Sequence, residues 1–335
     1  MRVAMLSSIS WRTPPRDYGP WELTTSLLTE ALIARGVDVT LFATLDSQTA
    51  GRLNGVAPRG YSEDPTLEAK VWEILHIAHV FERAGDFDLI HNQADFIPLG
   101  FSRLVETPML TTIHGFSSPR ILPAYQRYDD RVAYVAISDA NRDPSLTYAA
   151  TIHHGIRLEE FPFDPVGGPD LVFFGRIHPD KGPAEAIRAA RATGRRLTLY
   201  GLIQDEAYHA REVLPFVDGD AIAYRGVVGG ADRLRALGHA AGMLHLIGFD
   251  EPFGLAVIEA MACGTPVIAY RRGSMPELID HGITGFLVDS FDEAVAAIAR
   301  LPEIDRRACR MAVAERFTID RMADEYLALY RRLLG

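Results

Sequence analysis

Two acidic and two basic residues in the second half of the chain have types and spacing that suit the binding of a phosphorylated ligand. Glu251 and Glu259 lie eight residues apart in the stretch EPFGLAVIEAMACGTPVIA. Arg176 and Lys181 belong to GRIHPDKG, and Lys181 precedes Glu251 by seventy residues. A guanidinium binds phosphate through a bidentate fork, and an ammonium binds it as a compact charge. We therefore predict a diphosphate site in which the two glutamates bind sugar hydroxyls.

The stretch 251–269 predicts a turn, a helix and a buried strand. Pro252 suits the first turn of a helix, where its missing N–H costs nothing. Gly264 is expected to end that helix, and Pro266 prevents its continuation. Residues 267–269 are apolar, as is typical of a parallel strand buried on both faces.

The start of this helix is itself predicted to face an anion. The N–H groups of Phe253, Gly254 and Leu255 would point out of the helix start, where the helix dipole is positive. Gly254 would let a ligand approach the backbone closely. Along a helix axis Glu251 and Glu259 would lie roughly 12 Å apart, so a diphosphate flanked by two sugars would contact both.

The stretch 251–269 resembles the signature of retaining family 4 glycosyltransferases, which are group 1 glycosyltransferases of the GT-B fold. The segment 175–182 resembles the GRxxxxKG motif of that family, whose Arg and Lys hold the donor diphosphate. The resemblance covers the second half of the chain well and the first half loosely. It implies an α/β protein of two Rossmann-like, doubly wound domains that face a central cleft, with a C-terminal helix that crosses back to the first domain.

The length and composition agree with two domains. The chain has 335 residues, of which 48% are hydrophobic, and this is enough for two separate cores. Proline and glycine at 162–169 indicate a linker. We expect an acceptor domain at 1–158 that includes the helix 318–335, and a nucleotide-sugar donor domain at 159–317.

Strands and helices are expected to alternate through both domains. In the first domain we expect strands at 3–7, 37–43, 89–92, 109–114 and 133–137, and helices at 21–35, at 68–83 and after Ser138. In the second we expect strands at 171–175, 197–201, 221–224, 243–247, 267–269 and 285–288, and helices at 183–193, 234–241 and 318–334.

The loop before the first helix carries a second group of candidates. DYGPWE resembles the YGGxE loop found in part of the family, in which paired glycines present amides to the donor phosphate and sugar. Gly19 keeps that role, whereas Pro20 has no N–H to donate. Arg12 and Arg16 in the same loop are expected either to line the acceptor side or to be solvated charges.

Three aromatic side chains at strand ends complete the candidates. His114, in TTIHG, resembles the family histidine that contacts the donor sugar, and the alternative is a histidine of the cleft wall. His91 is expected to contact the acceptor or to be structural. Tyr224 is expected to pack on the nucleotide base or to belong to the core.

The resemblance implies a metal-independent hexosyltransferase. It would move a hexose from a nucleotide diphosphate sugar, with a UDP-sugar first and GDP-mannose second, to a hydroxyl acceptor with retention of configuration. The departing diphosphate would be stabilised electrostatically. The implied catalytic residues are Arg176, Lys181, Glu251 and His114, and the implied donor-binding residues are Gly19, Gly175, Phe253, Gly254, Leu255, Glu259 and Tyr224.

No metal or cofactor is expected besides the donor substrate. Asp86-Phe87-Asp88 and Asp218-Gly219-Asp220 match the DxD metal pattern, but 44 acidic residues make chance matches common. The net charge of −10 argues against nucleic-acid binding. The acceptor would be a saccharide, a lipid-linked molecule or a small molecule.

The same features suggest a cytoplasmic protein. The chain has only two cysteines, and it has no apolar run long enough for a signal peptide or a membrane span. Because some members of the family use lipid-linked acceptors, a peripheral membrane contact stays open, as does the oligomeric state.

Two other functions would use the same architecture. One is a nucleotide-sugar epimerase or hydrolase, which would need acid-base carboxylates facing the sugar in the first domain. The other is a non-catalytic nucleotide-sugar binding protein. Product analysis with and without an acceptor separates the three.

Overall fold

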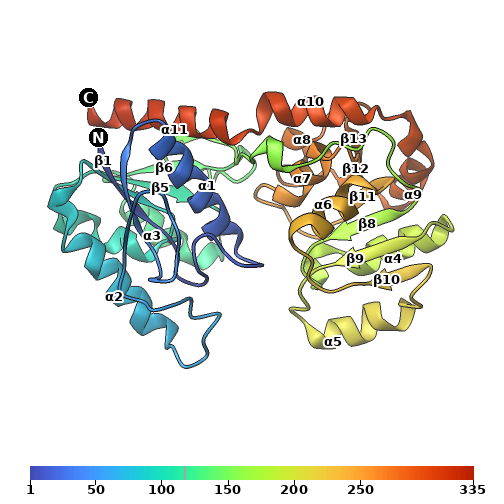
Figure 1. Ribbon diagram of the computed structural model, residues 1–335, viewed down its shortest axis with the longest axis horizontal. Coiled ribbons are helices and arrows are strands. Elements are labelled where there is room, and N and C mark those ends of the chain that lie inside the picture. Colours follow the sequence, from blue (N-terminus) through green and yellow to red (C-terminus); the bar gives the residue numbers. More distant parts are fainter. Residues whose placement is uncertain (117) are drawn as a thin grey trace. The chain divides into compact units, whose positions relative to one another are not determined.

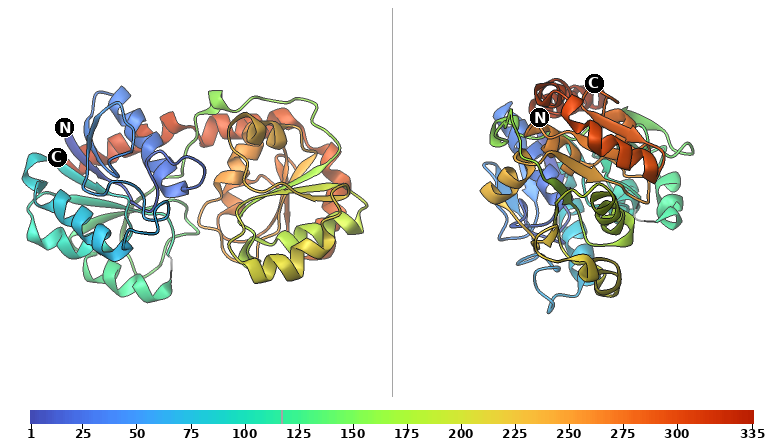
Figure 2. Two further views of the ribbon diagram at one scale, coloured as in Figure 1. Left: turned by 60° about the horizontal axis from the view of Figure 1, so that its bottom comes forward. Right: turned by 90° about the vertical axis from the view of Figure 1, so that its right-hand side faces the viewer.

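The computed structural model describes residues 1–116 and 118–335, which form two compact units (Figure 1). The first unit is Met1–Gly155 with Ile319–Gly335, and the second is Ile156–Thr318. The division thus falls at 155/156, close to the linker signals at 162–169. Within each unit helices cover both faces of one parallel sheet (Figure 2), so the predicted α/β class is confirmed.

The first unit is built on a seven-stranded sheet in the order β3-β2-β1-β4-β5-β6-β7. Every neighbouring pair is parallel, and β1 and β4 meet in the middle of the sheet. The strands are β1 (Arg2–Leu6), β2 (Asp38–Phe42), β3 (Arg52–Asn54), β4 (Leu89–Asn92), β5 (Met109–Ile113), β6 (Val132–Ala136) and β7 (Tyr148–Thr151). The helical segments are α1 (Pro20–Ala34), α2 (Ala69–Phe81), η1 (Ala84–Asp86), η2 (Ile97–Leu104), η3 (Pro119–Ile121) and α3 (Leu122–Arg127).

The last helix of the chain completes the core of the first unit. α11 (Ile319–Leu334) buries Met322, Tyr326 and Tyr330 in one apolar cluster with residues of β1, β2 and α1. Arg35, at the end of α1, pairs with Asp320 and Asp324 at 2.9 and 2.6 Å. The prediction that the C-terminal helix packs on the first domain is therefore confirmed.

The second unit is a six-stranded parallel sheet in the order β10-β9-β8-β11-β12-β13. Its strands are β8 (Leu171–Phe174), β9 (Leu197–Tyr200), β10 (Ile222–Tyr224), β11 (Gly242–His245), β12 (Val267–Tyr270) and β13 (Gly285–Val288). Its longer helices are α4 (Pro183–Ala192), α6 (Gly230–Gly238), α7 (Leu255–Ala262), α9 (Phe291–Arg300) and α10 (Arg306–Arg316). The shorter ones are η4 (Leu158–Glu160), η5 (Pro179–Lys181), α5 (Glu206–Tyr208), η6 (His209–Val213), η7 (Leu214–Phe216), α8 (Met275–Leu278) and η8 (Leu301–Glu303).

Not every predicted helix forms where it was expected, and α6, predicted from residue 234, already begins at Gly230. The helix expected from Pro252 begins at Leu255, because Gly254 takes a left-handed conformation with φ 104° just before it. The helix expected after Ser138 is replaced by turns over 139–146, and the Ser138 hydroxyl accepts from the Asn141 N–H at 3.0 Å. Pro144 disfavours a helical conformation in the residue before it, which keeps this segment too short for a helix.

Candidate active site

Lys181 and Glu251 form an ion pair at the carboxyl ends of β8 and β11. Lys181 ends η5, Glu251 lies in the loop between β11 and α7, and the Lys181 Nζ contacts the Glu251 carboxylate. Their side chains are only 16% and 12% exposed. The Lys181 Nζ also lies 4.7 Å from the centre of the Phe249 ring, which favours a cation. The structure therefore brings together two residues that the sequence separates by seventy positions.

The start of α7 presents backbone donors beside this pair. Gly254 is its N-cap at φ 104°, and a Cβ there would lie 2.8 Å from the Met275 Cε. In the described part of the chain, the N–H groups of Gly254 and Leu255 have no hydrogen-bond acceptor. Phe253 is buried, and its carbonyl accepts from the Ser274 hydroxyl. The amides and the helix dipole together suit a bound anion.

A tight turn after β12 fixes the backbone of Glu251. Gly273 has φ 50°, and a Cβ there would lie 2.5 Å from both the N and the O of Glu251. The next residue, Ser274, donates its N–H to the Glu251 carbonyl at 3.0 Å. The position of Glu251 thus depends on a close backbone contact that only glycine permits.

Gly182 places Lys181 against the end of β11. Its φ is 67°, and a Cβ would lie 1.9 Å from the Leu246 carbonyl oxygen. At the end of β8, the Gly175 N–H donates to the Tyr200 carbonyl at 3.1 Å. Arg176, the other predicted phosphate ligand, donates instead to the Gln204 side chain and takes no part in the Lys181 pair.

Glu259 is buried in α7 and pairs with Arg233 of α6. Its side chain is 3% exposed, whereas that of Arg233 is 30% exposed. Burial raises the pKa of Glu259, and the Arg233 charge opposes that rise. Arg233 was not predicted from the sequence, because only the packing of α6 on α7 distinguishes it from the other arginines.

Tyr224 is half-buried at the end of β10 in the second unit. Its hydroxyl donates to the Gly201 carbonyl at 2.8 Å, and its ring lies 5.4 Å from that of His209. The sequence analysis also missed His245, whose Nε2 lies 3.7 Å from the Glu251 carboxylate. Burial lowers the pKa of His245 to about 4, so the ring is neutral at pH 7. The position of His245 at the end of the strand that leads to Glu251 is the sequence signal that could have identified it as a candidate.

In the first unit His114 lies in a stack of three rings. It is parallel to Trp21 and to His154, each with ring centres 5.2 Å apart. The His114 Nε2 donates to the Gln93 side-chain oxygen at 2.6 Å, and burial lowers its pKa to about 3. His114 is thus a neutral hydrogen-bonding group. Trp21, which follows Pro20 at the start of α1, is a further aromatic residue that the sequence analysis did not select.

His91 is enclosed in the core of the first unit, which agrees with the structural alternative of the two that were expected for it. Its Nδ1 lies 2.5 Å from the Tyr330 hydroxyl, and its Nε2 lies 2.8 Å from the Thr112 hydroxyl. Burial lowers its pKa to about 3. Since no part of this ring is exposed, it has no free edge for an acceptor.

The loop before α1 is held by carboxylates. Arg16 pairs with Asp46 at 3.0 Å and with Glu63, and its side chain is half exposed, while the Arg12 Nε donates to the Pro14 carbonyl at 2.9 Å. Gly19 is the N-cap of α1, and a Cβ there would lie 3.0 Å from a Glu22 oxygen. This loop is therefore tied to the first unit at several points.

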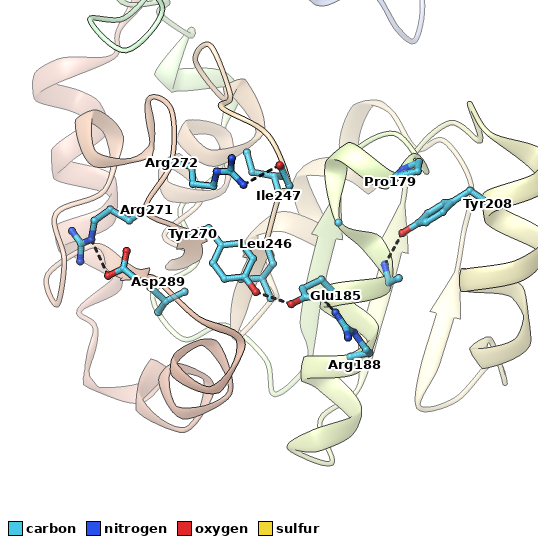
Figure 3. Close-up of a pocket in the computed structure, with 14 residues that line it drawn as sticks. Pro179, Glu185, Arg188, Tyr208, Leu246, Ile247, Tyr270, Arg271, Arg272 and Asp289 are labelled. Atoms are coloured by element: carbon cyan, nitrogen blue, oxygen red, sulfur yellow. Dashed lines mark hydrogen bonds and ion pairs between the residues drawn. The ribbon is translucent and has the colours of Figure 1, made fainter.

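A cavity of about 510 Å³ opens beside Gly182 in the second unit (Figure 3). It lies between α4 and the ends of β11, β12 and β13. Tyr270 donates to Glu185 at 2.7 Å, and Arg272 donates to the Gly248 carbonyl at 2.9 Å across its walls (Figure 3). Of its described lining residues, none is a predicted donor ligand.

The described residues contain no group of three or more His, Cys, Asp or Glu arranged to hold a metal ion. Of the two DxD matches, Asp88 pairs with Arg2 at 2.7 Å, and Asp218 accepts from the Asp220 and Ile222 amides at 2.9 and 3.0 Å. In the part of the chain described here, every helix is too short or too polar to cross a bilayer.

Solved structures of similar fold identify the class of architecture to which the two units belong. Solved structures of the same architecture include AviGT4, a glycosyltransferase involved in avilamycin A biosynthesis, with a TM-score of 0.75 and 24% identity over 100% of this chain and 98% of that one. Sucrose-phosphate synthase from Thermosynechococcus elongatus has a TM-score of 0.80 and 20% identity over 99% of both chains. The predicted GT-B fold class is confirmed.

Residues 159–316, just under half of the chain, match the family described as glycosyl transferases group 1. The D-inositol 3-phosphate glycosyltransferase of Pseudarthrobacter chlorophenolicus is 33% identical over 178 residues, which cover 51% of this chain and 40% of that protein. The protein of the same name from Mycobacterium avium is 30% identical over 61% of this chain and 54% of its own length. The matches thus span about half the length of these curated relatives.

Proposed function

We propose that the chain is a retaining glycosyltransferase that moves a hexose from a nucleotide diphosphate sugar to a hydroxyl acceptor without a metal ion. A UDP-sugar is the first choice of donor, and GDP-mannose is the second. The observation that carries the proposal is the nearly buried Lys181–Glu251 pair, followed in the chain by Gly254 and Leu255, whose N–H groups have no hydrogen-bond acceptor among the described residues. A solved relative in fold, Anabaena Alr3699/HepE, was crystallised with UDP and glucose, which supports the choice of donor.

The residues would act through electrostatics on the departing diphosphate. Lys181 would exchange its contact with Glu251 for a phosphate oxygen, and the α7 amides would bind a second one. Glu251, released from Lys181, would accept hydrogen bonds from the sugar hydroxyls. Glu259 would accept from the ribose hydroxyls, and Arg233 keeps its charge balanced. The acceptor proton would pass to the leaving phosphate oxygen, so no separate base is needed.

The experiment is a comparison of nucleotides followed by product analysis. UDP, GDP and ADP are each titrated while thermal unfolding is recorded, since a ligand at 100 times its Kd adds about 2.7 kcal/mol of stability. The anomeric configuration of the product is then read by NMR, with and without an acceptor. Stabilisation by UDP with retained configuration supports the proposal. Sugar release that ignores every acceptor would instead indicate a hydrolase or epimerase, and binding without turnover would indicate a binding protein.

A further inference from the structure

A second cavity lies wholly within the first unit, at the carboxyl ends of β1 and β4. Its volume is about 440 Å³, which falls in the range of small-molecule sites, about 300–1,000 Å³. One wall is α2, and another is the segment 7–10 that follows β1. None of the residues to which the family resemblance assigns a role lines it, among those that the structure describes.

A chain of hydroxyl groups runs along one wall and ends at a carboxylate. The Ser8 hydroxyl lies 3.3 Å from that of Ser10, which donates to the Tyr61 hydroxyl. Tyr61 in turn donates to one oxygen of Glu73 at 2.9 Å. In the described part of the chain the other Glu73 oxygen has no partner. Such a row of donors and acceptors matches the hydroxyls of a polyol.

His76 supplies an unpartnered acceptor in the same cavity. Its ring is 1% exposed, and its Nε2 lies 3.1 Å from the Ser7 carbonyl, so this nitrogen carries the hydrogen. The Nδ1 is buried and has no hydrogen-bond partner among the described residues. Because burial lowers the pKa of His76 to about 4, the ring is neutral at pH 7. The Nδ1 lone pair is therefore left without a donor among the described residues, and such orphaned buried groups are rare in proteins.

The cavity is connected to the candidate donor-sugar residue by one aromatic ring. Trp21 lines the cavity and also stacks on His114, with ring centres 5.2 Å apart and an interplanar angle of 22°. Apolar groups such as Ile9, Ile77 and Phe96 form the remaining walls. Aromatic and apolar surfaces of this kind suit the C–H faces of a sugar or cyclitol ring.

The charge of the cavity sets it apart from a phosphate site. Two carboxylates line it, Glu73 and Asp95, and the lining residues include no lysine and no arginine. Asp95 accepts from the Tyr125 hydroxyl at 2.5 Å, which fixes its side chain at the wall. A phosphorylated ligand would here meet two acids without a balancing cation, and like charges at a partly buried site are unfavourable.

We infer that this cavity binds the acceptor, and that the acceptor presents an uncharged polyhydroxyl ring to it rather than a phosphorylated one. Glu73, Tyr61 and the His76 Nδ1 would bind its hydroxyls, and Trp21 would cover one face of the ring. The inference rests on the proposed transferase function. It separates this chain from the curated relatives, whose name states an inositol phosphate as the substrate.

The test uses the full chain with Trp21 as its only tryptophan, obtained by Trp11→Phe and Trp72→Phe. Fluorescence is recorded during titration with two matched pairs: myo-inositol against inositol 3-phosphate, and glucose against glucose 6-phosphate. We expect the neutral member to change the Trp21 signal, with an affinity at least tenfold higher than that of its phosphorylated partner. Tyr61→Phe should weaken binding of the neutral ligand, and Glu73→Gln should narrow the difference within each pair. Glu68 is an exposed carboxylate at the start of α2, the helix that carries Glu73. The control Glu68→Gln should change neither the affinity for the neutral ligand nor the difference in affinity within each pair.

Tighter binding of the phosphorylated partner would overturn the inference, as would the absence of any signal from all four ligands. UDP binding by the same protein is measured separately, from the shift in thermal unfolding. This measurement distinguishes a failure of the inference about the acceptor from a failure of the proposed transferase function. If UDP stabilises the chain while no ring binds the cavity, only the inference about the acceptor fails. If UDP does not bind either, the proposed transferase function fails with it.

Discussion

Lys181 and Glu251 neutralise each other's charge as an ion pair, so a ligand that binds either side chain must replace the other as its partner. Each side chain is nearly buried, so either one alone would carry an uncompensated charge. In the proposed mechanism a diphosphate would replace the Glu251 carboxylate as the partner of Lys181. Glu259 and Arg233 repeat the arrangement at the other acid. At the scale of single residues the candidate site is therefore two ion pairs, each with a side chain that is nearly buried.

Replacing Lys181 by Ala should lower kcat by about 10² or more, by analogy with the loss of one oxyanion donor. The physical reason is that the developing charge on the leaving diphosphate loses its cation. Steady-state rates with a UDP-sugar measure the effect. Arg188→Ala, which removes a cation of the neighbouring cavity, is the control and should retain near-normal turnover. Normal turnover in Lys181→Ala would contradict the proposed role.

Glu259→Gln should raise the Kd for UDP while leaving kcat at saturation little changed, because the ribose contact is made equally before and during the reaction. The same change leaves Arg233 without its buried partner, so the unfolding free energy should fall as well. Calorimetric titration with UDP gives the Kd. Titration with a glycosyl phosphate that lacks ribose is the control, and an equal loss for that ligand would argue against the ribose contact.

Among the elements, α7 and the turns around it show what a sequence can predict. Gly264 and Pro266 end a helix by backbone chemistry alone, and the helix ends where they indicate. The start of the same helix was predicted at Pro252 and lies instead at Leu255, because Gly254 takes a left-handed conformation. The partners Arg233 and Trp21 could not be predicted, because each is chosen by contacts between elements distant in the sequence. The enclosure of His91 likewise depends on Tyr330, which lies 239 positions away.

The turn at Gly273 gives a test at the level of the element. Gly273→Ala adds a Cβ 2.5 Å from the Glu251 backbone at φ 50°, so Glu251 must move. We expect at least tenfold weaker UDP binding besides a loss of stability. The matched control is Gly194→Ala, at φ 64° with no atom within 4 Å of the added Cβ. The control should lower the unfolding free energy by only about 1–2 kcal/mol, because alanine is strained in the left-handed conformation, and it should leave UDP binding unchanged. Equal effects of the two changes on binding would refute the proposed contact.

At the scale of the whole molecule, buried neutral histidines make the first unit sensitive to acid. Burial lowers the pKa of His76 to about 4 and those of His91 and His114 to about 3, and it lowers that of His154 well below its usual value. Above pH 6.5 both folded and unfolded forms are neutral at these positions, so they contribute no pH dependence. As the pH falls below 6.5, only the unfolded chain takes up protons, and stability falls until the folded pKa is reached.

Each such histidine should therefore remove up to about 1.4 kcal/mol of unfolding free energy per pH unit below 6.5. The raised pKa values of Glu22 and Asp95 act in the opposite sense in the same unit. Urea unfolding of the chain and of His91→Gln between pH 7.5 and 5 isolates one histidine. We expect the unfolding free energy of the variant to fall less steeply with pH, because its unfolded chain takes up about one proton fewer. Parallel plots of unfolding free energy against pH for the two proteins would show that His91 does not contribute.

The packing of α11 on the sheet of the first unit leads to a further prediction. Tyr330→Phe should lower the unfolding free energy by about 1–3 kcal/mol, because the change leaves the His91 Nδ1 without its buried partner. UDP binding in the second unit should not change. Leu334→Ala, at an exposed position of the same helix, is the control for chemical denaturation and should be neutral.

Because the core of the first unit includes residues 319–330, it lacks part of its interior until the ribosome has made α11. The second unit, Ile156–Thr318, has all its strands before that point. Translation therefore finishes the later half of the protein first, and the earlier half must wait with apolar surface uncovered. Any premature stop before α11 would release a chain with one finished unit and one that cannot close.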